Sequence, residues 1–97
     1  MIDDLRDEID RIDEKIIRLI SRRADQAMKI GRHKIKEGLD ITDRDREKVV
    51  LNRVKELNEG PFEDEQVERI YGRIISETKE LQVEVDADDC SNEARSN

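Results

Sequence analysis

The sequence predicts an all-α protein with three helices per chain that covers part of its apolar surface with a second copy. Two observations predict helices: apolar residues recur at three- and four-residue spacing over most of the chain, and the 97 residues include one proline, Pro61. A third observation predicts oligomerisation. Only 34% of the residues are hydrophobic, with one Tyr, one Phe and no Trp, which leaves a small chain little material for a core.

A first helix is predicted over residues 2–36, where the apolar side chains follow one stripe. At roughly 1.5 Å per residue this helix is about 50 Å long, which exceeds the width of a globular domain of this size. Gly38 is suited to end it, because glycine readily adopts the left-handed conformation that follows many helices. Most of the stripe must therefore be covered by something other than the rest of its own chain.

Two further helices are predicted over residues 43–58 and 63–83. Either Thr42 or Asp43 can cap the free N–H groups at the start of the second helix. The turn residues at 58–61 separate it from the third. We expect a single domain over residues 1–83.

The acidic segment 84–97 carries five acidic residues against one basic residue, Arg95, and shows no helical stripe. We expect it to be a frayed, disordered tail outside the domain. The formal net charge of the whole chain is −7. This balance argues against nucleic acid as a partner and against binding to an anionic membrane surface.

Other features of the sequence exclude further classes of protein. The single cysteine, Cys90, cannot form an internal disulfide and belongs to no Cys/His set that would bind a metal. No apolar run approaches the roughly 20 residues of a membrane span, and the first residues are acidic where a signal peptide is basic. We therefore expect a cytoplasmic protein.

Polar residues on the apolar stripes are the most informative positions. Arg23 continues the series Ile9, Ile16 and Ile30, and Lys34 lies eleven residues further along the same face, roughly 16 Å away. Each of these two side chains alone could reach solvent past its neighbours. However, all three predicted helices carry such residues on their inward faces, namely Arg23, Lys34, Arg46, Glu47, Thr78 and Gln82. A small anion bound between the helices would account for them, because buried charges without partners cost several kcal/mol each.

Arg6 lies about 25 Å before Arg23 on the first helix and cannot join this cluster within its own chain. It could do so in an antiparallel dimer. Pairing two long helices about residue 17 places Arg6 of one chain level with residue 28 of the other, between Arg23 and Lys34.

These residues, in this order, resemble the all-helical AroQ class of chorismate mutase. The resemblance covers roughly residues 2–83 and rests on several separate pieces at compatible spacing. They are LRDEIDRIDEKI (5–16) with Arg6, SRRADQAMKIGRHK (21–34) with Arg23 and Lys34, TDRDRE (42–47) with Asp43, Arg46 and Glu47, and ISETKELQ (75–82) with Thr78 and Gln82. Thr78 stands where the family often has Ser.

The resemblance implies an intertwined homodimer that converts chorismate to prephenate, towards phenylalanine and tyrosine, without a cofactor or a metal. It also implies a role for each site residue. The partner's Arg6, Arg23 and Arg46 would bind the two substrate carboxylates, and Lys34 and Gln82 would act as catalytic donors to the ether oxygen. Glu47, with the Asp43 backbone, would receive the ring hydroxyl, while Thr78 would assist a carboxylate or fill space.

Two alternative functions compete with this interpretation. An isochorismate pyruvate lyase on the same fold also uses a cationic cavity, although the inward Glu47 suits the hydroxyl of chorismate better. A non-catalytic helical dimerisation or regulatory module is the other alternative. The charges on the inward faces argue against it, because an interface alone would carry Leu or Ile there.

Overall fold

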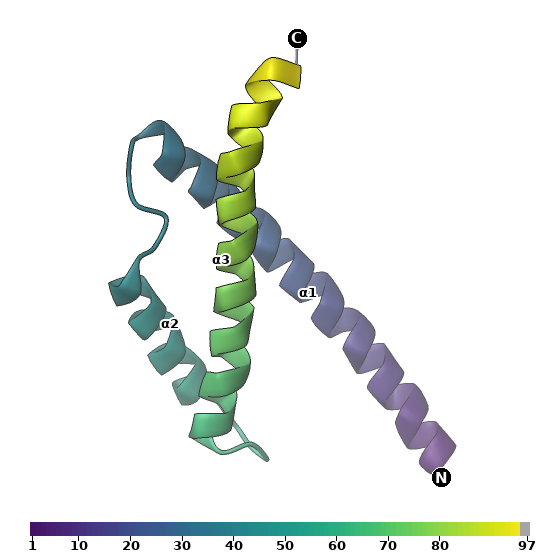
Figure 1. The fold of residues 1–97 in the computed structure, drawn as a ribbon. Coiled ribbons are helices and arrows are strands. Elements are labelled where there is room, and N and C mark those ends of the chain that lie inside the picture. Colours follow the sequence, from purple (N-terminus) through teal and green to yellow (C-terminus); the bar gives the residue numbers. More distant parts are fainter. Residues whose placement is uncertain (96–97) are drawn as a thin grey trace.

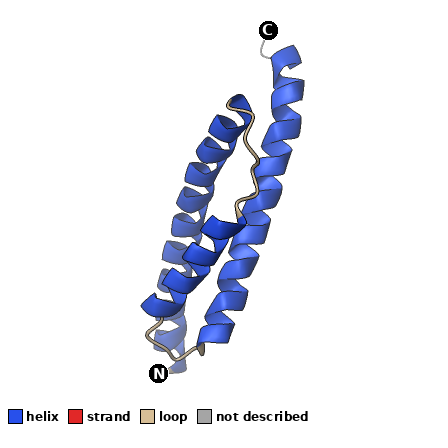
Figure 2. Cartoon of the chain, turned by 90° about the vertical axis from the view of Figure 1, so that its left-hand side faces the viewer, coloured by secondary structure: helices blue, strands red, loops and turns tan. Residues whose placement is uncertain are grey.

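The computed structural model describes the backbone of residues 1–95 and the side chains of residues 1–84. The chain forms three helices, α1 (Ile2–Lys36), α2 (Arg44–Leu57) and α3 (Asp64–Arg95) (Figure 1). Helices joined by two loops make up the whole described part of the chain (Figure 2). The predicted all-α fold class is confirmed.

α3 is the central element, because it packs against α1 on one side and α2 on the other. α1 crosses α3 with its C-terminal half, and its N-terminal half projects away from the other two helices (Figure 1). The Cα radius of gyration is 17.1 Å, compared with about 12.5 Å for a compact domain of this length. A single chain is therefore an open arrangement of helices rather than a closed core.

The ends of α1 and α2 follow the predicted signals. Gly38 has φ +70° just after α1, and its N–H donates to the carbonyl of Ile35 at 3.1 Å. Asp43 caps α2, since its Oδ1 accepts from the backbone N–H of Arg46 at 3.0 Å. Asp43 is therefore the N-cap of α2, and Thr42 is not. The backbone N–H of Thr42 instead donates to the carboxylate of Asp40.

The end of α3 differs from the expectation, because the helix continues past residue 83 to Arg95 instead of giving way to a frayed tail. The sequence from 84 to 95 contains neither Gly nor Pro. Extending an existing helix adds one hydrogen bond per residue without a new nucleation step, so no apolar stripe is needed. Polar composition was thus a poor indicator of where this helix ends. Residues 96–97 and the side chain of Cys90 lie outside the part of the chain that the structure describes.

The projecting half of α1 carries an uncovered apolar stripe. Its larger apolar side chains are all between 45% and 63% exposed: Ile2, Leu5, Ile9, Ile12, Ile16, Ile17 and Leu19. The same half also bears ion pairs within the helix, such as Arg11 with Glu8 at 3.2 Å. No helix among the described residues combines the length and the apolar character needed to cross a membrane.

The turn between α2 and α3 is organised by Asn58. Its Nδ2 donates to the carbonyl of Phe62 at 2.8 Å and to the carboxylate of Asp64 at 3.1 Å. Its Oδ1 accepts from the N–H of Gly60 at 3.0 Å. One half-buried amide therefore joins both sides of the turn and the start of α3.

We predict that Asn58→Ala lowers the free energy of unfolding by about 1 to 3 kcal/mol, because three hydrogen bonds are lost together. Chemical denaturation at fixed protein concentration measures the change. Glu59→Ala in the same exposed turn is the matched control and should stay within about 0.5 kcal/mol of the parent. Equal losses in the two variants would contradict this role of Asn58.

Candidate active site

A cavity of about 280 Å³ lies where the C-terminal half of α1, the first turns of α2 and the middle of α3 converge. Its polar lining comprises Arg23, Gln26, Lys34, Asp43, Arg46, Glu47, Thr78, Lys79 and Gln82. Its apolar lining comprises Ala27, Ile30, Ile41, Val50 and Ile75. The structure thus brings together every candidate from the sequence except Arg6, and it adds Gln26 and Lys79.

A wider hollow of about 620 Å³ runs along α1 itself, between Leu19 and Arg32. All of its lining residues come from α1. One helix cannot surround a ligand, so we assign the candidate site to the smaller cavity, which three helices line.

The charges in the cavity favour an anionic ligand. Four cationic side chains, Arg23, Lys34, Arg46 and Lys79, face two carboxylates, Asp43 and Glu47, which leaves an excess of two positive charges. Each helix supplies at least one of the cations. In a site partly screened from water, this excess matches a dianion.

Gln82 is held in place by the helix that it faces. Its Nε2 donates to the backbone carbonyl of Ala27 at 2.7 Å, which uses one of the two amide hydrogens. Gly31, the only buried residue of α1, allows this approach. A Cβ at residue 31 would lie 3.2 Å from Cγ of Gln82. The second amide hydrogen of Gln82 is therefore available to a ligand.

Thr78 is buried, with 9% of its surface exposed. Its hydroxyl donates to the carbonyl of Ile74, one turn earlier in α3, at 2.6 Å. Thr78 consequently offers the cavity a methyl group and an acceptor oxygen. This geometry favours the space-filling role over the donation of a hydrogen bond to a carboxylate.

Arg23 is half-buried and lies against an aromatic ring. Its guanidinium carbon is 5.4 Å from the centroid of the Tyr71 ring on α3, within the range of a cation–π contact. Tyr71 therefore restrains the guanidinium from one side. The N–H donors of Arg23 remain free for a carboxylate.

Arg6 lies apart from the cavity, on the projecting half of α1. Its side chain is 74% exposed, and its guanidinium is 4.0 Å from Asp3. This placement agrees with the sequence argument that Arg6 cannot reach the cluster within its own chain.

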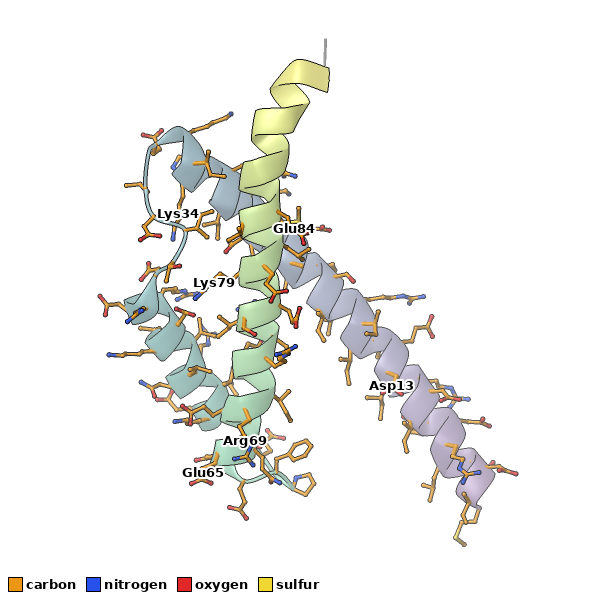
Figure 3. All side chains as sticks on the ribbon, in the orientation of Figure 1. Asp13, Lys34, Glu65, Arg69, Lys79 and Glu84 are labelled. Carbon is orange, nitrogen blue, oxygen red and sulfur yellow. The ribbon has the colours of Figure 1, made fainter. Side chains whose placement is uncertain are left out.

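Lys79, like Gln26, is a polar cavity residue that the sequence analysis missed. Its Nζ donates to Oε1 of Glu47 at 2.9 Å and so connects α3 to the first turn of α2 (Figure 3). A signal was present, because Lys79 lies four residues after Ile75 and three before Gln82, on the same helix face. Because 46% of the residues are charged, helix spacing alone does not distinguish Lys79 from a lysine that faces solvent.

Comparison with known proteins identifies relatives of this arrangement. The model of the family described as chorismate mutase type II matches residues 5–83. A chorismate mutase from Methanocaldococcus jannaschii is 34% identical over 80 residues, which cover 81% of each chain. The structure of chorismate mutase (form II) from Thermus thermophilus superposes with a TM-score of 0.82 at 34% identity, covering 84% of this chain and 92% of that one.

Bifunctional chorismate mutase/prephenate dehydratases also match. The protein from Aquifex aeolicus is 40% identical over 86 residues, which cover 84% of this chain. The present chain spans only 24% of that relative and 19% of the bifunctional protein from Neisseria gonorrhoeae. The family match, which reaches into all three helices and includes every polar residue of the cavity wall, shows that this chain belongs to the chorismate mutase type II family.

Proposed function

We propose that this chain is a chorismate mutase, which rearranges chorismate to prephenate in the synthesis of phenylalanine and tyrosine. The observation that carries the proposal is the cavity with two excess positive charges and a free amide donor, in a chain of this family. The substrate is a dicarboxylate with a ring hydroxyl and an ether oxygen. The cavity holds a suitable group for each of these features.

The chemistry explains why these residue types suffice. In this intramolecular rearrangement one C–O bond breaks as one C–C bond forms, so no nucleophile or proton-transfer base is required. The protein must select a folded conformer of the substrate and stabilise negative charge that grows on the ether oxygen. Fixed cations and neutral donors can do both.

We assign the roles as follows. Arg23 and Arg46 bind the carboxylates, because a guanidinium matches a carboxylate with two parallel hydrogen bonds. Lys34 and the second amide hydrogen of Gln82 donate to the ether oxygen. Glu47, assisted by the backbone at Asp43, accepts from the ring hydroxyl.

We also propose that the working form is a homodimer. The exposed stripe on the N-terminal half of α1 supports this, because no other described part of the chain covers it. An antiparallel pair of α1 helices would cover both stripes and bring the partner's Arg6 to each cavity. The third arginine would strengthen the hold on the substrate carboxylates. A cytoplasmic location remains a prediction from the sequence.

The purified chain should consume chorismate and produce prephenate, which loss of chorismate absorbance and product chromatography measure. Lys34→Ala should lower kcat by about two to three decades, because it removes a donor that acts mainly in the transition state. Formation of salicylate from isochorismate would instead favour the lyase. If neither substrate reacts, the non-catalytic module becomes the better account.

Gln82→Glu should make the activity depend on pH. A carboxyl group can donate to the ether oxygen only when it is protonated, so kcat should fall as the pH rises through the pKa of the new side chain. The parent, with a neutral amide, should keep its activity through neutral pH. Rate measurements from acidic to neutral pH compare the two. Parallel profiles would show that residue 82 does not face the reacting oxygen.

Mixing two inactive variants should restore activity if the partner's Arg6 completes each site. A heterodimer of Arg6→Ala and Arg23→Ala chains has one intact site and one site that lacks both arginines. After subunit exchange, up to about a quarter of the sites should be intact, since half of the dimers are heterodimers at random assortment. Native mass spectrometry confirms the exchange. Heterodimers without activity would refute the shared site.

A further inference from the structure

The ion pair between Lys79 and Glu47 is the feature of the cavity that the proposed roles leave unused. Nζ of Lys79 lies 2.9 Å from Oε1 of Glu47, and the two side chains are 34% and 26% exposed. They come from different helices, thirty-two residues apart in the sequence. The pair is therefore a tertiary contact inside the cavity wall, unlike the ion pairs within α1.

Glu47 presents an electrostatic problem to the proposed substrate. A carboxylate is needed to accept from the ring hydroxyl, yet it lies in the same cavity as a dianion and repels it. Asp43 is also anionic, but its Oδ1 accepts from the backbone at the start of α2. Lys79 offsets the charge of Glu47 at direct hydrogen-bond distance, so Arg23, Lys34 and Arg46 remain for the substrate.

The same contact restricts where the carboxylate of Glu47 points. A glutamate has three rotatable side-chain bonds, and the bond from Lys79 fixes the position of Oε1. This leaves Oε2 as the oxygen that faces a hydroxyl donor. Figure 3 shows Lys79 extending from α3 on the side that faces α2, which is the direction needed for this contact.

A second ion pair joins the same two helices away from the cavity. Nζ of Lys55, near the end of α2, lies 3.1 Å from Oε2 of Glu68 on α3, and the side chains are 31% and 43% exposed. Partly exposed pairs of this kind contribute little to stability. An ion pair between Lys79 and Glu47 would likewise add little to the stability of the contact between α2 and α3. Stability of this contact therefore does not by itself explain why a lysine lies in the cavity wall.

We propose that Lys79 is a positioning residue for the rearrangement: it orients the Glu47 carboxylate toward the ring hydroxyl of the substrate and offsets its charge against the two substrate carboxylates. This inference rests on the proposed function. It assigns Lys79 an effect that passes through Glu47 and not through direct contact with the reacting atoms.

A double-mutant cycle tests this mechanism. Lys79→Met should lower kcat/KM about tenfold, because it leaves a loosely held carboxylate facing the dianion. Lys79→Arg should recover most of the loss, since a guanidinium can also pair with Glu47. In the Glu47→Gln background, where there is no charge to offset, Lys79→Met should change kcat/KM less than about twofold.

Lys55→Met is the matched control, because it removes the other ion pair between α2 and α3, outside the cavity. It should leave kcat/KM within about twofold of the parent. Circular dichroism melting curves for all variants verify that the fold is retained.

Three results would overturn the inference while leaving the proposed function intact. These are an unchanged kcat/KM in Lys79→Met, an equal loss from Lys79→Met with and without Glu47, and an equal loss in Lys55→Met. A parent chain that does not turn over chorismate would overturn the proposed function, and this inference with it.

Discussion

The constraint on which the rest of the structure depends is the repulsion among four cations that converge from three helices. Such a cluster is stable without ligand only if each charge has water, a carboxylate or a polarisable neighbour within reach. Glu47 pairs with Lys79, and the ring of Tyr71 lies against Arg23. Arg46 is exposed to water. Among the described residues, no buried side-chain nitrogen or oxygen lacks a hydrogen-bond partner.

Close packing of α1 against α3 is what gives this charged site a fixed geometry. Gly31 removes the side chain that would separate the two helices, and Gln82 fills the space and bonds to the carbonyl of Ala27. The buried Thr78 lies one helical turn before Gln82 and bonds to its own helix. The neutral side of the cavity is therefore rigid, whereas the cations reach it from flexible stems. Such an arrangement suits a reaction in which a donor must already be in place when charge develops.

Much of this could be predicted from the sequence, because helix periodicity determines which residues share a face. The bounds of α1 and α2, the cap at Asp43 and the inward positions of Arg23, Lys34, Glu47 and Gln82 all follow from spacing and local hydrogen bonding. The roles assigned to these residues are still predictions. Lys79, the bond made by Thr78 and the extension of α3 to Arg95 were missed. The Lys79 contact depends on how α2 and α3 meet. The Thr78 bond depends on which acceptor its hydroxyl takes within α3, and the length of α3 on continued helix formation without a buried face.

α1 divides into two parts with different physical requirements, and this division connects the site to assembly. Its second half is partly covered by α3 and carries Arg23 and Lys34 into the cavity. Its first half leaves apolar side chains and Arg6 to solvent. A continuous helix transmits position along its axis, because each turn is hydrogen-bonded to the next. In the proposed antiparallel homodimer, a partner that covers the first half would therefore take a definite position relative to the cavity, so that burial of the stripe would also bring the partner's Arg6 to the site.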